Sequence, residues 1–91
     1  MKDRYTNTAK MLKALSDPKR LKIVDMLSRG ELCACVILEE FHITQPTLSH
    51  DMKVLVESGL VNYRREAKNI YYSMDKDAYI ELSESLKSVF E

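Results

Sequence analysis

Residues 44–74 read TQPTLSHDMKVLVESGLVNYRREAKNIYYSM, and the spacing of their apolar side chains changes at Gly59. Before this glycine, apolar residues recur every three or four positions, as on one face of an amphipathic helix: Leu48, Met52, Leu55 and Val56. Thr44 is a typical N-cap, and Pro46 fits the first turn of a helix. The pattern therefore predicts a helix over residues 45–58.

After Gly59, the sequence changes to two runs rich in β-branched and aromatic residues, at 60–65 and 70–74. The polar residues 66–69 separate the two runs and form a short tip, which is typical of an antiparallel hairpin. A helix is thus followed directly by a hairpin, which is the order found in winged-helix domains.

Toward the N-terminus, the same spacing predicts three more helices, over residues 4–15, from Pro18 to a stop at Gly30, and over residues 32–41. Asp17 is a suitable N-cap for the second of them, because a proline follows it at the first helical position. Residues 42–44 join the third helix to the helix at 45–58 by a connection as short as that of a helix-turn-helix. A last helix, capped by an aspartate, is predicted over residues 76–90.

The predicted fold is mainly α with a small β-hairpin, a winged helix-turn-helix in the order four helices, hairpin, helix. A chain of 91 residues supplies one domain, residues 1–91, and is near the lower end of what one core stabilises. An oligomer is therefore expected, and the two terminal helices are predicted to supply its interface. The apolar residues predicted to form this interface are Tyr5, Leu12, Leu15, Tyr79, Leu82, Leu86 and Phe90.

The composition excludes several classes of protein. Apolar residues make up 45% of the chain and charged residues 31%, as in an ordinary globular domain rather than a disordered one. No apolar run approaches the roughly 20 residues that cross a bilayer, and the first residues lead into no apolar signal segment. A cytoplasmic protein without a membrane partner is therefore expected. An enzyme is not expected, because neither a nucleophile with a paired base nor paired carboxylates in a plausible cleft can be identified.

The net charge is zero, with 14 basic and 14 acidic residues, which removes the simplest evidence for nucleic-acid binding. The charges are nevertheless unevenly distributed, because residues 1–22 are rich in basic side chains and residues 75–91 in acidic ones. A neutral molecule can still present a local basic face. Some of the basic residues near the N-terminus are expected to face DNA phosphates, and the others to be simply solvated: Lys10, Lys13, Lys19, Arg20 and Lys22.

Polar side chains occupy the face of the predicted helix 45–58 that lies opposite its apolar face. A helix fits the major groove of DNA, where short side chains read base edges and basic side chains bind phosphates. The predicted DNA-contacting residues are Gln45, Thr47, Ser49, His50 and Lys53 on the helix, and Arg64, Arg65 and Lys68 on the wing. Two other interpretations stay open: a merely solvated polar face, and a winged helix that docks proteins instead of DNA.

Cys33 and Cys35 lie at the start of the helix predicted over residues 32–41. In a cytoplasmic protein, two thiols are not expected to form a structural disulfide. Three interpretations remain: small apolar residues, ligands for a soft ion, or a redox pair. On a regular helix, side chains two residues apart point about 200° apart, so one ion bridges both sulfurs only if the first turn unwinds. Such unwinding would distort the first helix of the predicted helix-turn-helix, and ligand binding would then act as a switch.

Four motifs of the chain resemble the ArsR/SmtB family of metal-sensing repressors: LKALSDPKRL at residues 12–21, ELCAC at 31–35, TQPTLSHDMKVL at 44–55 and SGLV at 58–61. The resemblance extends over residues 12–74, and ELCAC is typical of the arsenic-sensing branch. It implies a homodimer that binds an inverted-repeat operator in double-stranded DNA and represses an arsenic-resistance operon. It also implies that As(III) or Sb(III), bound to Cys33 and Cys35, is the inducer that releases the operator, with no cofactor required.

The chain departs from the family's pattern at several positions. Many arsenic sensors carry a third cysteine where this chain has Leu38, so hydroxide or a small thiol would supply the third arsenic ligand. The terminal helix carries no histidine, so the zinc site of the other branch is not expected. His42 and His50 are interpreted as a turn residue and a DNA contact. Asp51 stands where relatives often have a second histidine or a basic residue, which would change the operator contacts.

The sequence thus predicts an As(III)- or Sb(III)-responsive repressor with a two-thiol inducer site. Two alternatives stay open. One is a thiol redox-sensing repressor on the same fold, in which Cys33 and Cys35 oxidise. The other is a winged-helix protein-interaction module that does not bind DNA.

Overall fold

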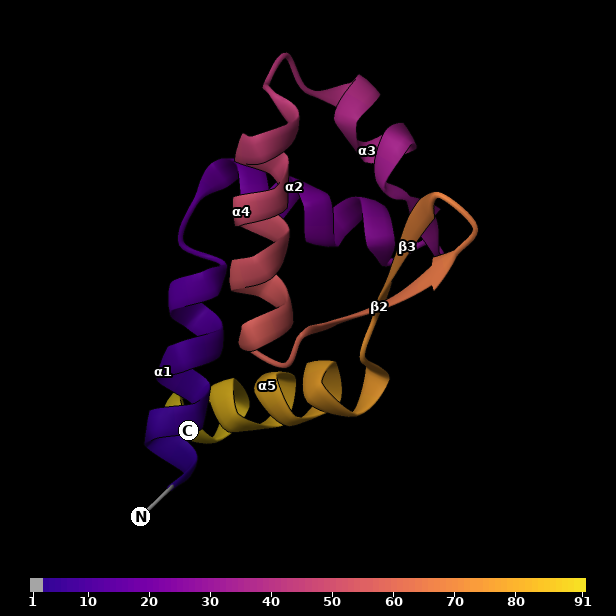
Figure 1. The fold of residues 1–91 in the computed structure, drawn as a ribbon. Helices are drawn as coiled ribbons and strands as arrows, with labels where there is room; N and C mark the ends of the chain where they lie inside the picture. Colours follow the sequence, from indigo (N-terminus) through magenta and orange to yellow (C-terminus); the bar gives the residue numbers. More distant parts are fainter. Residues whose placement is uncertain (1–2) are drawn as a thin grey trace.

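A computed structural model describes residues 3–91 and contains five helices and three strands in that part of the chain (Figure 1). In chain order these are α1 (Arg4–Ala14), α2 (Pro18–Leu27), β1 (Leu32–Cys33), α3 (Ala34–Glu40), α4 (Gln45–Glu57), β2 (Val61–Glu66), β3 (Asn69–Met74) and α5 (Lys76–Val89). α3 and α4 form a helix-turn-helix, and β2 and β3 form the hairpin that follows it. The prediction of a mainly α, winged helix-turn-helix fold is therefore confirmed.

Side chains at the predicted positions cap the helices. Asp17 accepts a hydrogen bond from the backbone N–H of Arg20 at 3.0 Å, and Thr44 accepts one from that of Thr47 at 3.3 Å. Asp75 caps α5 in the same way. These contacts satisfy backbone donors that have no partner within the first helical turn. The predicted starts of α2, α4 and α5 are confirmed for this reason.

The predicted start of the third helix is wrong. Leu32 and Cys33 form strand β1, and α3 begins only at Ala34. The strand pairs antiparallel with β3, where Leu32 lies opposite Tyr72 and Cys33 opposite Tyr71. Pairing with a distant strand outweighs the local helical preference, because propensity is a weak prior against tertiary contacts. The sheet therefore has the strand order β1-β3-β2, with β3 in the centre.

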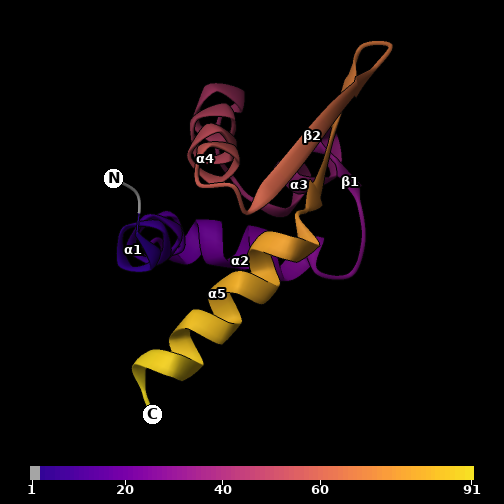
Figure 2. The same ribbon diagram turned by 90° about the horizontal axis from the view of Figure 1, so that it is seen from below.

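The hairpin is longer than predicted, and its tip is shorter. Pairing of β2 with β3 extends to Glu66 and Asn69, so only Ala67 and Lys68 form the turn. Ala67 has a φ of 56°, in the left-handed region that two-residue hairpin turns require at a central position. The hairpin extends away from the helices as a projecting wing (Figure 2).

One apolar core joins the helices to the base of the sheet. Its buried residues are Met11, Ala14, Ile23, Leu27, Ile37, Leu48, Met52, Leu55, Leu60, Val61, Tyr72 and Leu82. α4 stands between α1 and the hairpin, and α5 crosses below them (Figure 1). The predicted apolar face of α4 is confirmed, since three of its four residues belong to this core. Among residues 3–91, no helix has the length and apolar character needed to span a membrane.

Candidate functional site

The polar face of α4 is exposed along the helix. All five residues predicted to contact DNA from this helix are accessible: Gln45, Thr47, Ser49, His50 and Lys53. Burial of the apolar face in the core fixes the outward direction of these side chains. The Thr47 hydroxyl lies 3.0 Å from the Thr44 hydroxyl, so the helix cap also orients this side chain. The exposed face has the shape and the hydrogen-bonding groups that suit a major groove.

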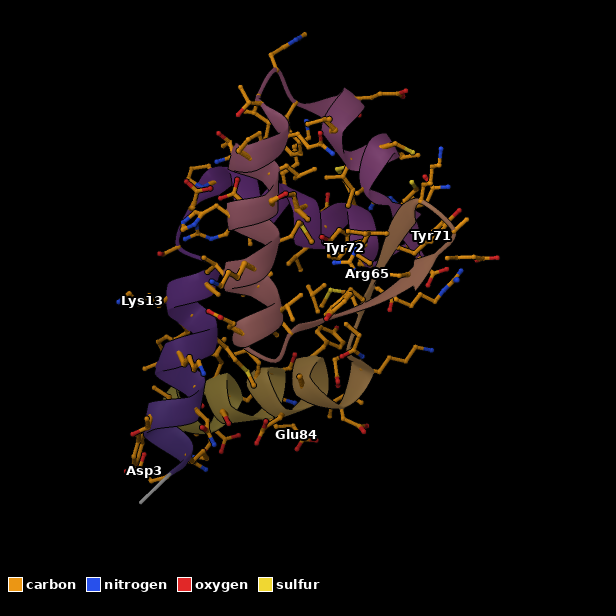
Figure 3. All side chains as sticks on the ribbon, in the orientation of Figure 1. Asp3, Lys13, Arg65, Tyr71, Tyr72 and Glu84 are labelled. Atoms are coloured by element: carbon orange, nitrogen blue, oxygen red, sulfur yellow. The ribbon has the colours of Figure 1, made fainter. Side chains whose placement is uncertain are left out.

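Two basic residues of the wing lie beside this polar face. Lys68 is exposed in the turn, and Arg65 lies on the side of the hairpin toward α4 (Figure 3). Arg65, Lys53 and Ser49 line one hollow of about 330 Å³ between α4 and the hairpin. Within the described residues 3–91, the side chains of Lys53, Arg65 and Lys68 form no ion pair. Their charge is therefore available to an anionic partner.

Arg64 differs from the other predicted DNA contacts, because carboxylates already bind it. Its Nε and Nη2 donate to the two carboxylate oxygens of Glu31, at 2.9 and 2.8 Å, and its Nη1 donates to Glu66 at 2.6 Å. The hydrogen bonds from Arg64 lower the pKa of the Glu31 carboxyl, and those carboxylates raise the pKa of Arg64. The expectation that Arg64 offers free positive charge on the wing is corrected by these contacts.

Asp51 is buried, with its side chain only 3% exposed, and it does not belong to the polar face of α4. Lys19 Nζ forms an ion pair with Oδ2 at 2.8 Å, without hydrogen-bond geometry, and Arg20 Nη1 donates to Oδ1 at 3.3 Å. Arg20 Nε also donates to the Ala14 carbonyl oxygen at 2.7 Å, so the cluster joins α1, α2 and α4. Two expectations are thereby corrected: Lys19 and Arg20 bind an internal carboxylate rather than phosphate, and Asp51 does not alter the exposed surface.

The two cysteines meet at the junction of β1 and α3. Cys33 ends β1 and caps α3, while Cys35 lies in the first turn of α3. Their sulfurs are 2.6 Å apart, and the Cys33 sulfur also accepts the backbone N–H of Cys35 at 3.3 Å. The expectation that a helix holds the sulfurs apart is wrong, because Cys33 has extended backbone angles (φ −67°, ψ 143°) and lies outside the helix. The pair is assembled without any unwinding.

The contact between the two sulfurs changes both thiol pKa values. The thiol of Cys35 donates to the sulfur of Cys33, which lowers the pKa of Cys33 and raises the pKa of Cys35. The backbone N–H groups of Cys35 and Val36 lower the pKa of Cys33 further, because they stabilise its thiolate. The thiolate form is therefore concentrated on Cys33.

At neutral pH, a limiting amount of iodoacetamide is expected to alkylate Cys33 in preference to Cys35. The thiolate is the reactive form, and the lower pKa gives Cys33 the larger thiolate fraction although Cys35 is more exposed. Fragment-ion mass spectrometry of the peptide that contains both cysteines measures the ratio. Equal modification, or an excess on Cys35, would mean that exposure rather than the thiol contact controls reactivity.

A cavity of about 210 Å³ connects the cysteine pair to α4 and the wing. Besides Cys33 and Cys35, its walls include Gln45 and Ser49 of α4 and Lys68 of the hairpin turn. The structure thus brings the predicted ligand pair together with three of the predicted DNA-contacting residues. A group bound to the sulfurs would lie between the two elements that present the polar surface.

The cysteine pair has no third protein ligand among residues 3–91, where no three His, Cys, Asp or Glu side chains gather. His42 and His50 are exposed and join no such cluster in that part of the chain. Two sulfurs suit a soft ion but do not close a tetrahedral zinc site. A soft ion bound here would take its remaining ligand from solution or from another molecule.

The terminal helices α1 and α5 pack together and leave apolar side chains exposed. The exposed members of the predicted interface are Tyr5, Leu12, Tyr79 and Phe90, and Phe90 is 85% accessible. Leu15 and Leu86 are half-buried. Leu82 is only 7% exposed and packs in the core of its own chain. The prediction that Leu82 lies in the dimer interface is corrected. The other six predicted interface residues are at least partly exposed.

The chain resembles known bacterial regulators in both its sequence and its fold. A family model described as "Bacterial regulatory protein, arsR family" matches residues 17–63, from the cap of α2 into the wing. The arsenical resistance operon repressor of Staphylococcus xylosus is 49% identical over 73 residues, which cover 80% of this chain and 70% of that protein.

Two solved structures extend the similarity to almost the whole chain. The transcriptional repressor BigR from Xylella fastidiosa is 38% identical with a TM-score of 0.73, covering 97% of this chain and 90% of that one. A homodimeric winged helix-turn-helix DNA-binding domain from Mycobacterium bovis is 28% identical with a TM-score of 0.76, covering 96% of this chain and 82% of that one. The matched family, the sequence identity and the shared fold agree that this chain belongs to the arsR family of bacterial regulatory proteins.

Proposed function

We propose that the protein is a repressor that binds an inverted-repeat operator in double-stranded DNA as a homodimer and releases it when As(III) or Sb(III) binds Cys33 and Cys35. The observation that carries the proposal is the position of the two sulfurs. They lie 2.6 Å apart and line a cavity whose other walls include Gln45, Ser49 and Lys68. This shared cavity supports a proposed inducer site next to the proposed DNA-binding surface. The family is one of regulators rather than enzymes, in agreement with the sequence.

The proposed capture of arsenite by the pair requires no redox partner. Two As–O bonds of arsenous acid are replaced by two As–S bonds, and the thiol protons leave with the two hydroxides as water. The third position on arsenic keeps a hydroxide or takes a small thiol. Soft, polarisable sulfur is a preferred ligand for such an ion. The bound ion would lie against both α4 and the wing, where it would disturb the surface that contacts DNA.

The exposed apolar surface of α1 and α5 supports the proposed homodimer. Tyr5, Leu12, Tyr79 and Phe90 give this surface large apolar side chains that are accessible in a single chain. The similar domain from Mycobacterium bovis is described as homodimeric. Two-fold symmetry through these helices would set the two α4 helices about one turn of DNA apart, ~34 Å.

Operator binding is the first test of the proposed function. Genomic fragments that the protein enriches supply the inverted repeat, and fluorescence anisotropy on that duplex then follows release by As(III), Sb(III), Cd(II), Zn(II) and peroxide. Release by As(III) and Sb(III) at lower concentrations than by the other agents is expected. Release by peroxide alone would favour a thiol redox sensor, for which the short distance between the sulfurs is equally suitable. Failure to enrich any DNA would favour a protein-interaction module.

Lys53→Ala is expected to weaken binding to specific and non-specific DNA alike. The side chain is exposed beside the wing and without an ion pair in the described structure, which suits a phosphate contact. Each phosphate contact contributes about 0.9 to the slope of log K against log salt, so the slope should fall by about that amount. An unchanged slope in anisotropy titrations would remove Lys53 from the phosphate contacts.

A further inference from the structure

Arg64 lies on the opposite face of the hairpin from Arg65. Side chains alternate along a strand, so Tyr63 and Arg65 share the side toward α4, while Arg64 is on the other side. There it stacks on Tyr71, its cross-strand neighbour, with the guanidinium carbon 4.5 Å from the centre of the ring. Tyr71 and Tyr72 lie on the two sides of β3 (Figure 3). Arg64, which the sequence predicted to contact DNA, thus belongs to the sheet face that α4 does not cover.

All three nitrogens of the Arg64 guanidinium are hydrogen-bonded to carboxylates. Glu31 accepts two of these bonds side by side, at 2.8 and 2.9 Å, and Glu66 accepts the third at 2.6 Å. A bidentate arginine–carboxylate pair fixes the geometry of both side chains more strictly than a single contact does. Glu31 is 33 residues away along the chain, so the pair is a specific tertiary connection.

Glu31 stands two residues before Cys33, at the entrance to β1. Cys33 itself pairs with Tyr71 of β3, and Arg64 on β2 lies opposite the same tyrosine. The segment that carries the first cysteine is therefore attached to both strands of the wing. Its backbone is attached to β3, and the Glu31 side chain is attached to β2 through Arg64.

We infer that Glu31 and Arg64 are positioning residues that couple occupancy of the cysteine pair to the orientation of the wing. The inference rests on the proposed function and names the route by which the inducer acts. A soft ion that changes the position of Cys33 moves Glu31 with it, because the two are separated by one residue. The two side-by-side hydrogen bonds to Arg64 then shift the orientation of its strand. When the ion pair is removed, occupied cysteines no longer pull on the wing through Glu31. The wing then keeps its DNA-binding orientation more often than in the wild-type protein.

The test is a double-mutant cycle with Glu31→Gln, Arg64→Gln and the double variant. Operator affinity is measured by anisotropy with and without saturating arsenite, and the ratio of the two is the inducer response. Without arsenite, each variant should bind the operator within about threefold of wild type, because an exposed pair contributes little stability. The inducer response of each single variant should be at least fivefold smaller than that of wild type. The response of the double variant should be no smaller than that of either single variant.

A matched control and a binding measurement separate coupling from folding or ligand loss. Asp25→Asn breaks an exposed ion pair between Asp25 of α2 and Arg29, which follows the helix, and it should keep the full response. Thiol titration with a disulfide reagent should give the same protection of two cysteines by arsenite in wild type and in both Glu31 and Arg64 variants.

Two results would overturn the inference. Weaker operator binding by Arg64→Gln but not by Glu31→Gln, without arsenite, would make Arg64 a phosphate contact. A full arsenite response in both variants, with a responsive wild type, would overturn the coupling and leave the proposed function in place. A wild-type protein that binds its operator and ignores arsenite would instead overturn the proposed function together with the inference.

Discussion

Cys33→Ser and Cys35→Ser are each expected to abolish release of the operator by arsenite while leaving operator binding within about twofold of wild type. A hydroxyl is a poor ligand for a soft ion, and the remaining sulfur alone cannot chelate it. The readout is anisotropy of the operator duplex during an arsenite titration. Release of either variant at the wild-type arsenite concentration would refute the two-thiol switch.

The position of Cys33 makes its serine variant especially informative. Cys33 is the N-cap of α3, and serine is a strongly preferred residue at an N-cap. The substitution therefore preserves the start of the helix, and a lost arsenite response cannot be ascribed to unfolding. Ala34→Ser is the matched control, because it introduces the same hydroxyl between the cysteines and leaves both sulfurs in place. This control should release the operator as wild type does.

Asp51→Ala is expected to lower the free energy of unfolding by about 2–3 kcal/mol. The substitution removes the carboxylate that both Lys19 and Arg20 contact, and leaves Lys19 only the more distant Asp17, at 3.9 Å. The effect is placed below that of a fully buried pair, because the two cationic side chains are 27% and 17% exposed and keep part of their hydration. Urea denaturation at a fixed protein concentration measures the change, since dimer formation makes stability depend on concentration.

Glu40→Ala provides the control for that measurement. It removes the partner of Lys22 in an ion pair whose side chains are about half exposed, and it should change stability by no more than about 0.5 kcal/mol. A similarly small effect of Asp51→Ala would mean that solvent adequately replaces the carboxylate at the junction of α1, α2 and α4.

Local signals were sufficient to predict most of the fold. Caps at Asp17 and Thr44 and the apolar spacing along α4 act within one or two helical turns, so they can be read from neighbouring residues. The hairpin was predictable for the same reason, since its two strands are adjacent in the chain. The burial of Asp51 also had a signal, because it follows Leu48 by three residues and precedes Leu55 by four, on the apolar face.

The features that were not predicted depend on partners far away in the chain. β1 has only two residues, and no periodicity can be recognised in so short a strand. Its extended conformation depends on Tyr71 and Tyr72, and the contacts of Arg64 depend equally on Glu31. A basic residue on a wing is read as a DNA contact until its carboxylate partner is known. The geometry of the cysteine pair follows from β1, so it could not be predicted without that strand.

The Cys33 sulfur has two roles at the junction of β1 and α3. It accepts the Cys35 amide hydrogen at the beginning of α3, and it is one of the two sulfurs open to a soft ion. A sulfur that formed a bond to arsenic would keep lone pairs for the amide hydrogen, but it would carry less negative charge and accept that hydrogen bond more weakly. α3 has only seven residues, so the hydrogen bond at its first turn contributes a large share of its local stability. The N-terminal end of the helix that precedes α4 is therefore held in part by a single sulfur.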